Sequence, residues 1–119
     1  MKKIIVASLM ASVWIGGCSS LPKEQRLYEA AYQVIHAIDA AQTLNIRKKE
    51  GNYETNPILG ERPKDAEVIA YMAAESALHY AVTYQLAEKG APMWVQHAWH
   101  CISIGWNGKV IISNHKRGL

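Results

Sequence analysis

Apolar residues recur at helical spacing through the first part of the chain after residue 22. Between about Lys23 and Lys49 they return at three- and four-residue steps, in a segment rich in good helix formers. The predicted inner face carries Tyr28, Ala31, Tyr32, Ile35, Ile38, Gln42 and Ile46. The predicted outer face carries Arg26, Glu29, Gln33, Arg47 and Lys48. Gly51 is a stop signal, so the pattern predicts a helix over residues 23–49.

A second helical segment is predicted from about Pro63 or Asp65 to Lys89. Proline suits the first helical position, and Gly90 just beyond the last periodic residue is a stop signal. The predicted inner face carries Val68, Tyr71, Met72, Glu75, Leu78, His79, Val82 and Leu86. Residues 51–64 contain two glycines and two prolines, and they predict the connecting loop.

The last segment, residues 92–119, fits two patterns. Asn107-Gly108 lies between partly alternating apolar residues, which favours a β-hairpin. Helical spacing also fits this segment. One helical face would carry His97, His100, Ile104, Asn107, Ile111 and Asn114. Because an isolated hairpin is marginally stable in water, we expect a helix and keep the hairpin as the alternative. The predicted fold class is therefore all-α, a small three-helix bundle.

The start of the chain has a different pattern. Lys2 and Lys3 precede an apolar run, Ile4–Ile15, which is too short for a membrane-spanning helix of about 20 residues. A basic start, a short apolar run and small residues are typical of a secretory signal peptide. The run ends in Ile-Gly-Gly-Cys, and this stretch around Cys18 resembles the lipobox of bacterial lipoproteins.

The lipobox resemblance implies that residues 1–17 are a signal peptide that is removed and that Cys18 becomes an acylated N-terminus. Its acyl chains, palmitate among them, would anchor the protein in membrane lipid, and no other cofactor is predicted. Residues 18–22 would form a short tether to a domain over residues 23–119. By the sorting rule of such lipoproteins, Ser19 favours the periplasmic face of the outer membrane of a Gram-negative bacterium.

The composition narrows the class of partner. The chain has 13 Lys and Arg against 10 Asp and Glu, and removal of Lys2 and Lys3 leaves 11 against 10. No basic stripe remains for nucleic acid, so we predict no nucleic-acid partner. Cys101 would be the only free thiol after Cys18 is acylated, and we expect it to be buried as a small apolar group.

Polar residues interrupt both predicted inner faces. His36, Asp39 and Thr43 share a side of the first helix, and Glu75 and His79 lie one turn apart on the second. Buried charged groups must be paired, neutralised or bound to a cation. We expect a hydrogen-bond network in which Asp39 bonds His79 or a tyrosine hydroxyl. Glu75 is expected to bond His36 in the same network.

Two alternatives stay open for this polar cluster, namely a metal site and acid–base catalysis. Its imidazoles and carboxylates are ligand types that suit Zn or Fe, and helical bundles host such sites. The metal ligands would be His36, Asp39, Glu75 and His79, with His100 as a further candidate. The spacing is not a specific metal signature, and the sequence shows no nucleophile. We therefore predict neither a metal nor an enzymatic activity.

The loop contains a turn motif formed by Glu54, Asn56, Pro57 and Gly60. Asn-Pro favours a turn, and glycine allows positive φ. Together with Asp39-Ala-Ala-Gln-Thr upstream, and with His79, Asn114 and Gly118 downstream, this motif resembles a group of small proteins of proteobacteria and their phages or prophages. These are lipoproteins or membrane-associated proteins without an established activity. The resemblance implies a compact, mostly helical protein and brings no catalytic role.

Trp99 and Trp106 are seven residues apart and would share one side of a helix. Unless they are packed in the core, they form an apolar stripe that contacts another protein or the bilayer interface. We therefore predict a non-catalytic binding module at the membrane surface. Its partner would be an outer-membrane protein, in the manner of phage or prophage lipoproteins that mask a receptor. A further alternative is that the second and third helical segments insert in a membrane. Residues 66–87 are long and apolar enough for this, but Glu75 at their centre counts against it, as does an outer-membrane destination.

Overall fold

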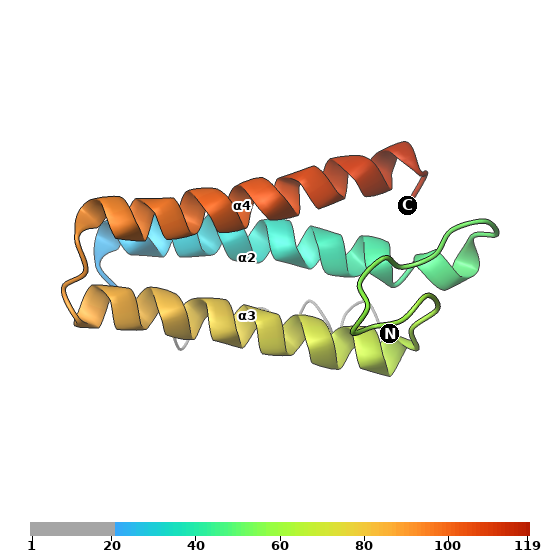
Figure 1. Cartoon of the computed structure of the whole chain (residues 1–119), viewed down its shortest axis with the longest axis horizontal. Coiled ribbons are helices and arrows are strands. Elements are labelled where there is room, and N and C mark those ends of the chain that lie inside the picture. The colour runs from blue at the N-terminus through green and yellow to red at the C-terminus, as the bar shows by residue number, and fades with distance from the viewer. Residues whose placement is uncertain (1–20) are drawn as a thin grey trace.

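The computed structural model describes residues 21–119, which form an antiparallel bundle of three long helices (Figure 1). The elements are α2 (Lys23–Thr43), a single 3-10 turn η2 (Ile46–Lys48), α3 (Asp65–Glu88) and α4 (Met93–Lys116). Residues 21–119 contain no strand, so the all-α prediction is confirmed. The alternative of a hairpin in the last segment is wrong, because α4 runs unbroken through Asn107-Gly108. The predicted signal peptide, Cys18 and residues 19–20 lie outside the described residues.

The turn between α3 and α4 is set by Gly90, whose φ of +64° lies in the left-handed region that glycine adopts without strain. The N–H of Ala91 donates to the carbonyl of Leu86 over 2.9 Å, which closes the C-terminal turn of α3. α4 begins three residues after Gly90 and therefore returns antiparallel to α3. The predicted stop signal thus acts at the predicted place.

α2 lies between the other two long helices. It packs along α4 and along α3, whereas α3 and α4 contact each other much less (Figure 1). The first helix ends at Thr43, not at Lys49, and the 3-10 turn follows it. The long connection from this turn to α3 folds over the end of the bundle far from the α3–α4 turn (Figure 1). The side chain of Arg117, just after α4, donates to the carbonyl of Tyr53 over 2.6 Å and so ties that connection to the end of α4.

The interior of the bundle is unusually polar. Among residues 21–119, the buried apolar side chains are Leu21, Tyr32, Ala40, Ile46, Val68 and Met72. The buried polar side chains are more numerous: Gln25, Glu29, Gln33, His36, Asp39, Thr43, Ser76, His79, Thr83, Gln96, His100 and Asn114. A buried polar group destabilises a fold unless it is hydrogen-bonded, so this interior depends on side chains that satisfy one another.

The predicted orientation of two helices is partly wrong. Glu29 and Gln33 were expected on the outer face, yet they are 0% and 2% exposed. Ile38 and Leu78 were expected inside, yet both are exposed. The physical reason is that α2 buries a polar stripe at about four-residue steps, from Gln25 onward, instead of its most apolar side. The side of a helix that faces the core, when it is inferred from apolar periodicity, is therefore wrong for these residues.

The structure also bears on the predictions for Cys101, for the tether and for membrane insertion. Cys101 is exposed, so the prediction that it is buried is wrong. Leu21 is buried, which shows that the packed domain begins within the stretch predicted as a tether. Among the helices formed by residues 21–119, none is long and apolar enough to cross a membrane.

Candidate functional site

The middle of the bundle contains a buried hydrogen-bond network centred on Glu29. The Nδ1 atom of His79 lies 2.9 Å from Glu29 Oε2, and the hydroxyl of Thr83 donates to the same oxygen over 2.8 Å. Gln33 Nε2 donates to the other carboxylate oxygen over 2.7 Å, and the hydroxyl of Ser76 donates to the side-chain oxygen Oε1 of Gln33. The network therefore joins α2 to α3 through hydrogen bonds to both oxygens of one buried carboxylate.

The ring of His79 is held between two aromatic side chains. Tyr32 stacks on it with ring centroids 3.4 Å apart, and Trp99 stacks with centroids 4.7 Å apart. The indole N–H of Trp99 donates to the Thr83 hydroxyl over 3.1 Å, so Trp99 belongs to the same network. This packing fixes the plane of the imidazole, while its Nε2 atom is buried without a hydrogen-bond partner.

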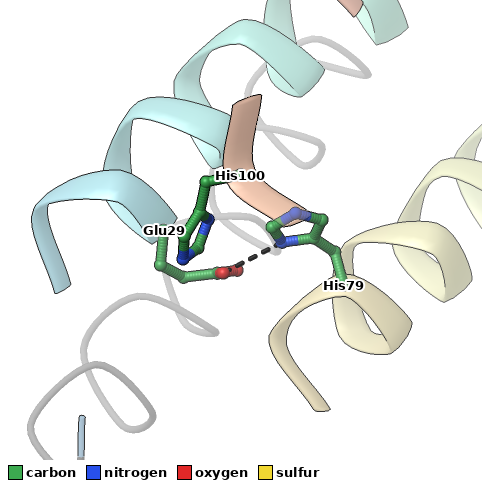
Figure 2. A group of neighbouring side chains, drawn as sticks. All are labelled: Glu29, His79 and His100. Atoms are coloured by element: carbon green, nitrogen blue, oxygen red, sulfur yellow. Dashed lines mark hydrogen bonds and ion pairs between the residues drawn. The ribbon is translucent and has the colours of Figure 1, made fainter. Parts of the chain in front are cut away.

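His100 reaches the network from α4. Its Nε2 atom lies 2.8 Å from the side-chain oxygen Oε1 of Gln25, which can only accept, so Nε2 carries the proton. Its Nδ1 atom is buried and has no hydrogen-bond partner within residues 21–119. Burial and the neighbouring charge of His79 lower the pKa of His100 to about 4, so this imidazole is neutral near pH 7. Figure 2 shows Glu29, His79 and His100 gathered from three different helices.

The charge state of Glu29 is set by competing effects. Burial by itself would raise its pKa. The hydrogen bond and charge of His79, with hydrogen bonds from Gln33 and Thr83, outweigh burial and hold the pKa below the ordinary 4.5. Glu29 is therefore an ionised carboxylate in the interior at neutral pH.

A cavity of about 340 Å³ opens near the loop end of the bundle, between all three helices and the connection before α3. Its lining comprises Tyr32, Asp39, Thr43, Glu54, Thr55, Asn56, Pro57, Leu59, Tyr71, Met72, Glu75, Trp106, Asn107, Val110 and Asn114. Three carboxylates are in this lining, and one of them, Asp39, is buried. We call this hollow the acidic cavity.

Asp39 is the electrostatically unusual group of the acidic cavity. Burial raises its pKa to about 6; the charge of His36 acts against this, whereas the charges of Glu54 and Glu75 add to it. The side-chain amide of Asn114 donates to Asp39 Oδ1 over 3.3 Å. At neutral pH Asp39 is therefore ionised in surroundings that disfavour its charge. Perturbed carboxyls of this kind concentrate at functional sites.

The loop motif shapes the mouth of the acidic cavity. Glu54 Oε1 accepts the backbone N–H groups of Thr55 and Asn56 over 2.8 and 2.9 Å, and Asn56 Oδ1 accepts that of Ile58 over 3.0 Å. Gly60 has φ +73°, so the predicted need for glycine there is confirmed. These bonds rigidify the segment that covers the cavity.

A second hollow of about 260 Å³ adjoins the acidic cavity between α3 and α4. It is lined by Tyr32, Glu75, Leu78, His79, Trp99, Ile102, Ser103, Trp106 and Asn107. Of these, Leu78, Ile102 and Trp106 are 64%, 71% and 66% exposed. We call this hollow the α3–α4 groove. It shares Glu75 and Trp106 with the acidic cavity, so an apolar stripe lies directly beside the carboxylates.

The structure divides the predicted polar cluster into two parts. Asp39, Thr43 and Glu75 line the acidic cavity together with the loop residues Glu54, Asn56 and Pro57, and His79 joins Glu29 instead. Gly60 lines a different hollow, formed by the loop residues alone. Of the two tryptophans considered for an apolar stripe, Trp106 is exposed, whereas Trp99 is half-buried against His79.

Two pairings were predicted within the polar cluster. Glu75 lies beside His36 as predicted, but their side-chain atoms are 3.9 Å apart, and the Nε2 atom of His36 bonds the main-chain carbonyl of Met72 at 3.0 Å instead. Asp39 bonds Asn114 and not His79, so that pairing is wrong. The residues that do come together are Glu29, His79 and His100. The predicted metal ligands were His36, Asp39, Glu75 and His79, with His100 as a further candidate.

Sequence reasoning missed Glu29 and the glutamines on either side of it in the network. The available signal was the row Gln25, Glu29, Gln33 at four-residue steps, which places three polar groups on one side of a helix. Such a row is usually solvated, and only the facing donors on α3 and α4 show that it is buried.

Comparison of the chain with models of protein families, with curated proteins and with solved structures found no match.

Proposed function

We propose that the protein is an outer-membrane-anchored lipoprotein whose periplasmic domain is a non-catalytic binding module. Its partner is an outer-membrane protein that presents a lysine or arginine flanked by apolar residues. The observation that carries this proposal is the acidic cavity, in which Asp39, Glu54 and Glu75 share one hollow. No lysine, arginine or histidine is among the described residues that line it. A bound cation would supply the missing positive charge.

The α3–α4 groove would bind the apolar residues that flank the cationic side chain of the partner. Exposed apolar groups that gather in one place mark interaction surfaces, and the side chains of tryptophans are frequent anchors in them. Trp106 lines both hollows, so one extended segment can place a cationic side chain in the cavity and apolar side chains in the groove. The rigid loop motif keeps the mouth of the cavity preformed, which lowers the entropy lost on binding.

The partner contact is tested by crosslinking in intact cells. A photoreactive residue at Ile102, in the groove, is expected to crosslink to one dominant outer-membrane protein, identified by mass spectrometry. The same residue at Leu27, exposed on α2 and outside both hollows, is the matched control and is expected to give no such band. Adding Trp106→Ala should reduce the Ile102 band at least about tenfold, the effect of losing an interface anchor.

Two results of this crosslinking experiment would contradict the proposed binding surface. One is the same set of bands from Ile102 and Leu27, which would indicate contact without a specific surface. The other is an Ile102 band that Trp106→Ala leaves unchanged in a variant that melts at the wild-type temperature.

The anchor is tested separately, because residues 1–20 lie outside the described structure. Replacing Cys18 by serine removes the thiol that acylation requires, so the protein is expected to leave the outer-membrane fraction. Several buried acyl chains hold a protein firmly, whereas one chain alone binds reversibly. The measurement is membrane fractionation with labelled palmitate, and Cys101→Ser is the control that keeps both label and location. Palmitate label on the Cys18→Ser protein would refute the lipobox prediction.

A further inference from the structure

We propose that Glu29, His79 and His100 bind one transition-metal ion of the zinc or ferrous-iron class. These residues come from α2, α3 and α4 respectively, and all three are buried. One ligand atom of each lies within 4.8 Å of those of the other two (Figure 2). Two imidazoles and one carboxylate form the ligand set of many catalytic zinc sites and of the non-haem iron facial triad. The site is separate from the acidic cavity, whose lining includes none of these three residues.

An unused nitrogen atom is the first sign of a ligand at this place. His100 Nδ1 is buried without a hydrogen-bond partner among the described residues, although buried polar atoms are nearly always paired. His79 faces the cluster through Nδ1, which lies 2.9 Å from Glu29 Oε2, so a bound ion would take the place of the proton between them. On His100 the proton is on Nε2, which faces Gln25, so the unpartnered Nδ1 presents a lone pair. A metal ion would use this lone pair and would give Nδ1 the partner that the polar network does not supply.

The surrounding groups orient the ligands as metal sites require. Gln25 holds the far nitrogen of His100, the role that second-sphere acceptors have in known sites. Gln33 holds one oxygen of Glu29, and Ser76 in turn fixes Gln33. Tyr32 and Trp99 fix the plane of the His79 ring. Each candidate ligand therefore has a partner that sets its direction.

The distances are compatible with a metal after small side-chain movements. Three atoms no more than 4.8 Å apart lie within about 2.8 Å of a common point, and zinc ligands sit about 2.0–2.2 Å from the ion. The ligands must therefore close by less than about 1 Å. Of the three residues, His79 also lines the α3–α4 groove, from which an ion and a fourth ligand such as water would enter.

The test measures metal binding by the full-length protein in detergent, purified without a polyhistidine tag and stripped with a chelator. Addition of Zn²⁺ is expected to give one bound equivalent by mass spectrometry of the metal. It should also raise the melting temperature by about 10 °C at a hundredfold excess over Kd, because the ion binds only the folded state. Co²⁺ in place of Zn²⁺ should give intense visible absorption from a four-coordinate site.

The matched variants are His100→Gln and His97→Gln. His100→Gln removes one ligand and is expected to weaken Zn²⁺ binding at least a hundredfold. His97 is on the same helix but is half-exposed and pairs with Glu24, so His97→Gln is expected to bind like wild type. Wild-type protein that binds no Zn²⁺ or Co²⁺ at micromolar concentration, or equal binding by His100→Gln, would overturn the proposal.

A separate readout covers the case in which His100→Gln does not fold. The imidazole resonances of wild-type protein then decide the matter, since Co²⁺ bound at this site must shift those of His79 and His100 and spare that of His97. Shifts confined to the surface residue His97 would refute the site. If the protein binds no metal, the result expected from crosslinking at Ile102 does not change, because metal binding and partner binding are measured in separate experiments.

Discussion

Replacing Glu29 by alanine is expected to destabilise the domain by about 3–5 kcal/mol, the range for breaking a buried charged pair. The substitution leaves the donors of His79, Gln33 and Thr83 without their acceptor in a place that water does not reach. It also opens a cavity between α2 and α3. Because these three donors converge on a single carboxylate, this one substitution removes three hydrogen bonds from the interior.

The measurement is urea denaturation of the wild type and of the variant at pH 7. Glu24→Ala is the matched control, because Glu24 is on the same helix and pairs with a histidine at the surface. That exposed pair should contribute about 0–1 kcal/mol. A loss of less than about 1 kcal/mol in Glu29→Ala would contradict the view that the polar network holds the bundle together.

The difference between wild type and Glu29→Ala should also depend on pH. The pKa of Glu29 is lower in the folded state than its ordinary 4.5, so its ionised form stabilises the fold. This contribution is complete above the unfolded-state pKa and is lost as the pH falls through the folded-state pKa. The stability difference measured at pH 7 should therefore shrink in acid, below about pH 4.5.

Replacing Asp39 by asparagine is expected to have the opposite effect and to stabilise the domain at pH 7.5 by about 3 kcal/mol. The folded-state pKa of Asp39 is about 6 against an ordinary 3.8, and each unit corresponds to about 1.4 kcal/mol. Ionisation of Asp39 therefore opposes folding at neutral pH. Asparagine keeps an oxygen that accepts from Asn114 but has no charge.

The sign and the pH window of this effect can be checked directly. A raised folded-state pKa means that the protonated carboxyl favours the fold below pH 3.8, and that this advantage is lost as the pH rises through about 6. The gain from Asp39→Asn should therefore be full at pH 7.5 and nearly absent at pH 4. Urea denaturation at both values tests it, with Glu50→Gln on the exposed turn before the loop as control. An equal gain at both pH values would contradict the assigned cause.

The same Asp39→Asn variant is expected to lose partner capture at Ile102 although it folds more stably. A residue that destabilises the fold in the absence of a partner and strengthens binding is the usual trade-off at a functional site. Lowering the pH from 7.5 to 5 should weaken capture by the wild type, because Asp39 gains a proton near pH 6. Capture that persists in Asp39→Asn would remove the main electrostatic support for the acidic cavity as the binding site.

The local features of the fold could be predicted from the sequence because they depend on near neighbours. Helical spacing located α3 and α4, and Gly90 marked the end of α3. Gly60 and the Asn-Pro turn located the bend of the loop, since positive φ and turn geometry are properties of a few adjacent residues. The side of the first helix that carries Asp39 and Thr43 was also predicted correctly, and both residues line the acidic cavity.

Which polar residues meet was decided only by the tertiary structure. Glu29 and His79 are 50 positions apart, and Gln25 and His100 are 75 apart, so no local pattern links them. A polar row on a helix is equally compatible with water and with burial, and facing donors alone make burial favourable. The sequence therefore determined the helices, the turns and the types of chemical group available. The rotation of α2 about its axis, which turned Glu29 inward, depended on the hydrogen bonds that α3 and α4 supply.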